Sequence, residues 1–273
     1  MFTVALCQYE YAGVATADDL CTRAEGLFET AGPADLYVLP ELFATDFTAT
    51  ETEEERLLTG DALTTVEQFV ASQASARDAL VVGGSYRTRD EDDAIANRTP
   101  IGRPDGSLTT YTKRHPTPEE RERGTRRGTA PPPVIEHAGT SVGVIICYDV
   151  EFPAAVAAVA DAGAEVLAVP SLTATEAGFQ RVSRCSAARA VENQLYVAHV
   201  PLVGSHPHPE KAGTGRGAVY GPCDDVVGPD GTGLTLPRDE HCAASQSLDV
   251  QRLRDSRAEA SVRPYTDRSY FDS

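Results

Sequence analysis

Three residues that could act together on a carbonyl carbon each follow a segment expected to form a β-strand: Glu41, Lys113 and Cys147. A cysteine attacks a carbonyl or nitrile carbon as its thiolate. A carboxylate held among apolar neighbours has a raised proton affinity and can act as the general base. An ammonium group can hold the oxyanion that forms. The three residue types together indicate covalent catalysis by a thiol.

The segments before these residues indicate where their side chains lie. Residues 36–39 and 142–146 are short apolar runs typical of buried strands, and residues 108–112 form a weaker strand. Ligands of open α/β sheets bind where such strands end. Pro153 suits the first turn of a helix, so we expect Cys147 in a tight turn between a strand and a helix. A helix N-terminus nearby would favour the thiolate.

Other residues could complete this chemistry. The backbone N–H of Tyr148, directly after the cysteine, is the natural second donor to an oxyanion. Hydrolysis of a thioester needs a base, which could be Glu41 or a second carboxylate. Glu120 is the candidate for that carboxylate, with Glu119 as the alternative. An exposed charge is the competing interpretation for Glu120.

A weak internal repeat is present. Residues 165–171 copy the pattern of residues 35–41, which is an acid, four apolar residues, a proline and a polar residue. The repeat suggests two halves related by a pseudo-two-fold axis. Ser171 and Leu172 lie past the end of the strand predicted in the second copy, and for that reason we predict that they line the substrate pocket.

Taken in order, these motifs resemble the nitrilase superfamily of carbon–nitrogen hydrolases. The resemblance rests on residues 40–43 (PELF), 111–115 (YTKRH) and 143–149 (GVIICYD). It also rests on the order Glu, Lys, Cys, on separations of 72 and 34 residues, and on residues 189–194 (RAVENQ) after the cysteine. It covers nearly the whole chain.

The resemblance implies an α/β fold, a four-layer αββα sandwich of two mixed sheets, in one domain over residues 1–273. It implies Glu41 as base, Lys113 as oxyanion donor, Cys147 as nucleophile and Glu120 as a second glutamate. It also implies no metal, no organic cofactor and a homodimer or higher homo-oligomer. The substrate would be a small amide or carbamoyl compound. A nitrile is the alternative, and an acyltransferase or a catalytically silent scaffold of the same fold stays open.

The composition limits the partners. The net charge is −17, which disfavours nucleic acid and anionic membranes as partners. Only Lys113 and Lys211 are lysines among 24 basic residues, so a lysine at position 113 suggests that a compact point charge is needed there. The acidic surface also suggests adaptation to salt. The chain shows no apolar run long enough for a membrane span and no signal peptide, and its six cysteines form no C-x-x-C pair, so we expect reduced thiols in the cytoplasm.

A cysteine–histidine hydrolase is the rival enzyme. His199 ends an apolar run and could lie near the site, whereas His206 and His208 lie in a proline-rich loop. The H-x-H pair could bind a metal, but no third ligand has suitable spacing, so a metal site is not expected.

The remaining polar residues near the cysteine are expected to have structural roles. Asp149 could accept N–H groups of the turn, and Arg189 is expected to pair with Glu192. Helices are predicted to begin at Thr16, Asp61 and Thr175 as N-caps. Residues 113–120 are predicted to be a loop because of their two prolines and their charges, and the acidic residues 51–55 a solvated turn or loose helix.

Overall fold

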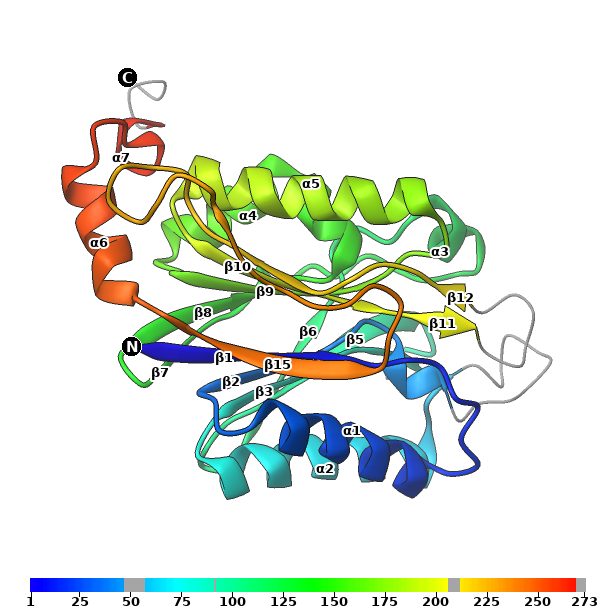
Figure 1. Ribbon diagram of the computed structural model, residues 1–273. Coiled ribbons are helices and arrows are strands. Elements are labelled where there is room, and N and C mark those ends of the chain that lie inside the picture. The colour runs from blue at the N-terminus through cyan, green and yellow to red at the C-terminus, as the bar shows by residue number, and fades with distance from the viewer. Residues whose placement is uncertain (47–56, 91, 206–211, 269–273) are drawn as a thin grey trace.

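The computed structural model describes residues 1–46, 57–90, 92–205 and 212–268. The predicted acidic segment 51–55 and the pair His206 and His208 lie outside these ranges. Figure 1 shows two sheets packed face to face with helices on both outer sides.

In the described part of the chain, the first sheet has seven strands in the order β15-β1-β2-β3-β5-β4, with β6 paired to β5. Its pairs β1–β2 and β2–β3 are parallel and the others are antiparallel, so the sheet is mixed. Its strands are β1 (Phe2–Gln8), β2 (Leu36–Leu39), β3 (Leu80–Gly83), β4 (Tyr86–Arg89), β5 (Ile95–Gly102), β6 (Leu108–Thr112) and β15 (Cys242–Leu248).

The second sheet is also mixed and has six strands among the described residues, in the order β14-β13-β10-β9-β8-β7. Its strands are β7 (Val134–His137), β8 (Thr140–Val144), β9 (Val166–Leu172), β10 (Tyr196–Leu202), β13 (Ala218–Tyr220) and β14 (Thr232–Thr235). A separate short pair joins β11 (Gly204–Ser205) to β12 (Ala212–Gly213).

Alternating side chains of the strands form the layers. In β1, Val4 and Leu6 belong to the core between the sheets, whereas Ala5 and Cys7 face the first helical layer. Successive strand residues point to opposite faces, so a strand buried on both faces needs an unbroken apolar run. This explains the apolar runs in the sequence, and the predicted four-layer αββα sandwich is confirmed.

Helices cover the outer faces. Figure 1 shows α1 (Ala17–Ala31) and α2 (Gly60–Arg77) on the first sheet, and α4 (Pro153–Asp161) and α5 (Glu176–Asn193) on the second. The described residues also form α3 (Pro118–Glu122), α6 (Val250–Glu259), α7 (Pro264–Asp267) and the 3-10 helices η1 (Phe43–Thr45) and η3 (Cys147–Glu151). None of the helices in the described ranges has the length and apolar character needed to cross a bilayer.

The helix starts were predicted with one error. Thr16 caps α1 in a capping box with Asp19, and the Thr175 side chain accepts the Gly178 N–H at the start of α5. The prediction of Asp61 as a cap was wrong, because Thr59 is the N-cap residue of α2 and Asp61 lies inside its first turn. An acidic residue is also favourable there, because it faces the positive end of the helix.

Candidate active site

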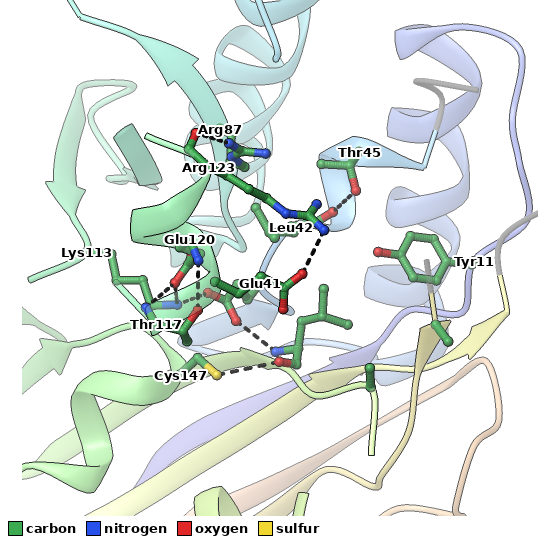
Figure 2. A pocket seen from close by; sticks show the side chains of 14 residues that line it. Tyr11, Glu41, Leu42, Thr45, Arg87, Lys113, Thr117, Glu120, Arg123 and Cys147 are labelled. Atoms are coloured by element: carbon green, nitrogen blue, oxygen red, sulfur yellow. Dashed lines mark hydrogen bonds and ion pairs between the residues drawn. The ribbon is translucent and has the colours of Figure 1, made fainter. Parts of the chain in front are cut away.

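The predicted base, cation and thiol meet in one cavity of about 250 Å³. Figure 2 shows Glu41, Lys113, Glu120 and Cys147 directed into it. They come from the ends of β2, β6 and β8 and from α3. The other lining residues are Tyr11, Leu42, Thr45, Arg87, Thr117, Glu119, Arg123, Leu172, Ala174 and Ala212.

Glu41 is placed by a sharp turn after β2. Leu42 adopts a left-handed conformation, with φ 57°, and its N–H donates to Ser85 Oγ at 3.0 Å. Gly84 packs so closely on this turn that a Cβ there would lie 2.2 Å from the Pro40 carbonyl oxygen. The turn therefore needs a glycine beside it, and it points a carboxylate that is only 2% exposed into the cavity.

Lys113 lies directly after β6 and joins the two carboxylates. Its Nζ donates to Glu41 Oε1 and to Glu120 Oε2, each at 2.7 Å. The lysine is 1% exposed. Two carboxylates around one buried ammonium offset the desolvation of that charge.

The prediction of a loop over residues 113–120 was wrong for the part of this segment that carries Glu120. Residues from Pro118 onward form the short helix α3, capped by Thr117. The Thr117 side chain accepts the Glu120 N–H, and the Glu120 carboxylate accepts the Thr117 N–H at 2.7 Å. Thr117 and Glu120 have the T-x-x-E spacing of a capping box, and Pro118 suits the first turn of a helix, so the helix start has a local sequence signal that a loop prediction from two prolines overlooks.

Cys147 opens η3 in a strained conformation, with φ 45°. A left-handed conformation at a non-glycine residue costs roughly 1–3 kcal/mol and is concentrated at functional sites. The predicted turn between a strand and a helix is confirmed, because β8 ends at Val144 and α4 begins at Pro153.

Asp149 holds this turn from inside. It is fully buried and accepts the Ile146 N–H at 3.2 Å, the Tyr111 hydroxyl at 2.8 Å and the His115 N–H at 2.8 Å. The first bond lies within the cysteine turn and the other two come from the segment around Lys113. One carboxylate therefore connects the turn at Cys147 to the segment that carries Lys113.

Arg189 holds the turn from the helical side. Its Nε donates to the Val150 carbonyl at 3.1 Å and its Nη2 to the Glu151 carbonyl at 3.2 Å. Its predicted pairing with Glu192 is confirmed at 2.8 Å. Because these contacts occupy the guanidinium group, Arg189 supports the turn and does not line the cavity.

The two copies of the sequence repeat meet at the site. The Leu172 N–H, at the end of β9, donates to Glu41 Oε2 at 2.9 Å. The Leu172 carbonyl accepts from Cys147 Sγ at 3.7 Å. The backbone of Leu172 therefore contacts both the carboxylate and the thiol.

Burial and neighbouring charges separate the proton affinities of these groups. The pKa of Glu41 is raised, first by burial and then by the Glu120 charge, although Lys113 opposes this. Burial also raises the pKa of Glu120, but the charge and hydrogen bond of Lys113 outweigh it and leave that pKa lowered. Burial disfavours a charged Lys113, yet both carboxylates and Cys147 raise its pKa well above the usual value. One carboxylate is thus a better proton acceptor than the other.

The expected stabilisation of the thiolate is not found. The pKa of Cys147 is raised well above the usual value, first by burial and then by the Glu41 charge, and Lys113 only partly offsets this. Burial and the neighbouring Glu41 charge thus shift the pKa in the direction opposite to the one expected from a helix N-terminus. The resting residue is therefore a thiol beside a carboxylate.

The other predicted residues lie as follows. Ser171 is fully buried, and its Oγ is 2.7 Å from His199 Nε2, so its side chain does not line the cavity. The Tyr148 ring packs edge-on against Phe152 and does not line the cavity either, so its backbone N–H remains the group of interest. His199 packs on Phe179, and burial lowers the pKa of its imidazole to about 4. The His199 ring contacts Ser171 and Phe179 and does not line the cavity, which does not support the cysteine–histidine alternative.

Sequence reasoning missed Asn97 and the arginines Arg87 and Arg123. Asn97 is fully buried between the two carboxylates, and the arginines line the cavity. Arg87 and Asn97 are partners in the β4–β5 register. Polar residues in a weak strand carried no sequence signal, and pairing with β6 is what places Asn97 beside Lys113.

Within the described residues, no group of three histidine, cysteine or acidic side chains has the arrangement of a metal site. All six cysteines are free thiols, and Cys7 and Cys21 are buried as small apolar side chains.

Comparison with known proteins gives consistent matches. The family model described as carbon–nitrogen hydrolase matches residues 3–232. The chain is 30% identical to the probable hydrolase YhcX of Bacillus subtilis over 278 residues, covering 98% of this chain and 54% of YhcX. It therefore spans about half the length of that relative. It is 32% identical over 258 residues to the deaminated glutathione amidase of Bos taurus, covering 86% of this chain and 75% of that protein.

A solved structure with a similar fold is Saccharomyces cerevisiae Nit3, a member of branch 10 of the nitrilase superfamily. The TM-score is 0.77 at 22% identity, covering 94% of this chain and 93% of that one. At this identity the comparison concerns the fold.

Proposed function

This chain belongs to the carbon–nitrogen hydrolase family, and we propose that it hydrolyses the C–N bond of a small amide or carbamoyl compound through a thioester on Cys147. The observation that carries the proposal is Lys113, whose Nζ lies 2.7 Å from both Glu41 and Glu120 in the cavity that Cys147 lines. A structural ion pair would not need a thiol, two carboxylates and a cavity at one place.

The first step is acylation. Cys147 Sγ attacks the amide carbon while its proton passes to Glu41, whose raised pKa suits it to this transfer. Lys113 and the Tyr148 N–H hold the oxyanion. Glu41 then returns the proton to the amide nitrogen, the C–N bond breaks, and ammonia or an amine leaves.

The second step is hydrolysis of the thioester. Water attacks the acyl carbon and gives a proton to Glu41 or Glu120, the C–S bond breaks, and the sulfur regains its proton as the acid leaves. The lowered pKa of Glu120 favours Glu41 as the acceptor of this proton, which leaves Glu120 ionised beside the Lys113 ammonium group. Glu41 then carries the proton between sulfur, nitrogen and water.

Size and relatives support an amide substrate. A cavity of about 250 Å³ is smaller than the sites that enclose drug-sized ligands. Relatives with amidase names are among the similar proteins. No feature of the described cavity favours a nitrile over an amide, so the nitrile is an outcome of the test.

The test is a screen of small ω-amides, carbamoyl amino acids and nitriles for release of ammonia, with hydroxylamine present to trap acyl groups as hydroxamates. We expect amide turnover and hydroxamate formation in the wild type and neither in Cys147→Ala. Turnover of nitriles alone would favour the nitrilase alternative. Turnover that persists in folded Cys147→Ala would contradict the proposal.

The assembly and location of the protein are part of the proposal. We expect a homodimer or higher homo-oligomer in the cytoplasm, as the family resemblance implies. A mass of 29.1 kDa, that of one chain, measured by light scattering coupled to size-exclusion chromatography would contradict the expected homo-oligomer.

A further inference from the structure

Asn97 closes a ring of hydrogen bonds around the two carboxylates. Its side-chain Nδ2 donates to Glu41 Oε1 at 3.0 Å and to Glu120 Oε1 at 2.9 Å. Lys113 makes the second link between the same two residues. Both amide hydrogens of Asn97 are thus used by the site, and the side chain is fully buried.

The orientation of this amide is fixed by charge. In the flipped orientation, the Asn97 carbonyl oxygen would face two carboxylate oxygens, which accept hydrogen bonds and cannot donate them when ionised. In the observed orientation, Oδ1 is buried without a hydrogen-bond partner among the described residues. An unpaired buried acceptor costs stability. The observed orientation therefore pairs both N–H donors of the Asn97 amide and leaves its carbonyl oxygen unpaired.

The bonds to Glu41 are divided unequally between its two oxygens. Oε1 accepts from Asn97 and Lys113, whereas Oε2 accepts from the Leu172 N–H. A carboxylate oxygen has two lone pairs, so Oε2 is the oxygen with room for another proton. Asn97 thereby prevents rotation of the carboxylate and leaves Oε2 as the proton acceptor.

The side chain of Asn97 carries no charge, which matters equally for the pKa of Glu41. A second cation in its place would add to Lys113 and lower the pKa of Glu41, whereas an acid would raise it. An amide donates hydrogen bonds to both carboxylates and adds no charge to the site. Lys113 is then the cation that is hydrogen-bonded to both Glu41 and Glu120, while Arg87, Arg123 and Glu119 are further charged residues of the cavity lining.

We propose that Asn97 is a positioning residue that holds Glu41 with Oε2 free to accept a proton and sets the pH at which Glu41 becomes an active base. This proposal rests on the proposed function, because Glu41 must be the base for its position to matter. It predicts that the acidic limb of kcat/KM, which reports Glu41 in the free enzyme, depends on residue 97.

The main test compares Asn97→Leu and Asn97→Asp with the wild type over a pH series. Loss of a donor to an ionised carboxylate raises the pKa of that carboxylate, so the acidic limb should move up by about 1 pH unit in Asn97→Leu. In Asn97→Asp it should move further, because a negative charge is added. Both variants should lower kcat more than they raise KM.

The sequence provides a matched control. Asn193 is the only other asparagine of the chain, is also buried, and donates to the Arg189 carbonyl in α5. Asn193→Leu should keep the acidic limb of the wild type. An acidic limb that stays at the wild-type pH in both Asn97 variants would overturn the proposal.

A second measurement uses the wild type and does not depend on folded variants. Labelling with ¹⁵N-asparagine gives only two side-chain amide groups, those of Asn97 and Asn193. The Asn97 amide signals should shift with pH at the midpoint of the acidic limb, and the Asn193 signals should not. Asn97 signals that do not respond at that midpoint would contradict the proposal. A wild type that turns over no substrate would instead refute the proposed function, so the two failures are distinguishable.

Discussion

Replacing Lys113 by methionine should show how the site balances its charges. The variant keeps the length of the side chain and removes the ammonium group from between Glu41 and Glu120. In the wild type the side chains of Lys113, Glu41 and Glu120 are 2%, 3% and 15% exposed. Removing one partner of a buried ion pair costs about 3–5 kcal/mol, because the remaining charge stays buried and uncompensated. We expect a loss of that size in the free energy of unfolding at about pH 8.

This loss should shrink as the pH falls. In the wild type, the lowered pKa of Glu120 adds stability above its unfolded pKa, and that stability is lost as the pH falls. Without Lys113, Glu41 and Glu120 are two buried carboxylates side by side, so at least one should have a pKa above its unfolded value. A group with a raised folded pKa destabilises the protein at high pH and regains stability as it takes up its proton. The difference in the free energy of unfolding between the wild type and Lys113→Met should narrow by roughly 1.4 kcal/mol per pH unit for each proton bound.

Urea unfolding of both proteins across about pH 5 to 8 measures the gap, where one protonation would account for roughly 2–3 kcal/mol. Arg181→Met is the control, since Arg181 is 60% exposed and pairs with Glu151 at the surface. It should cost below about 1 kcal/mol at every pH. A gap for Lys113→Met that does not change with pH, or one as small as that of the control, would refute the reasoning.

Three further predictions concern the site and the surface. Lys113→Arg should lower kcat by roughly 10²–10³, the effect of losing an oxyanion donor, because a planar guanidinium group cannot replace a compact ammonium donor. Steady-state kinetics measure this effect, and a wild-type kcat would contradict the role of Lys113 as oxyanion donor. Alkylation of Cys147 by iodoacetamide across pH, followed by peptide mass spectrometry, should give an apparent pKa above the ordinary thiol value of about 8.5. Glu41→Gln should lower this pKa, because the Glu41 charge raises it. An unchanged pKa of Cys147 in Glu41→Gln would contradict the electrostatic coupling between the two residues. If the net charge of −17 reflects salt adaptation, Tm should rise with KCl toward molar concentrations, and a flat response would exclude it.

The main features of the fold and the position of the site could be predicted from the sequence for a physical reason. Strands buried on both faces require continuous apolar runs, and such runs precede both Glu41 and Cys147. The hairpin between β7 and β8 likewise has a local cause, because Ala138 and Gly139 in its turn have positive φ. These features depend on neighbours in the sequence, which pattern analysis can read.

Features that depend on tertiary neighbours were missed or wrong. Asn97 is placed beside Lys113 by strand pairing, which no local pattern specified. Ser171 faces His199, whereas the backbone of Leu172 contacts Glu41. Their place past a strand end could not say which of the two residues contacts the site. The raised pKa of Cys147 comes from burial and from Glu41, a residue 106 positions earlier in the chain.

The most direct test of the central claim is rapid-quench mass spectrometry of Cys147 during turnover of an amide found in the screen. We predict that an acyl group appears on the Cys147 peptide before steady state and is lost as the acid forms. In Glu41→Gln it should not form at the wild-type rate. Acid formation with no acyl group on Cys147, or with the acyl group on another residue, would contradict the account.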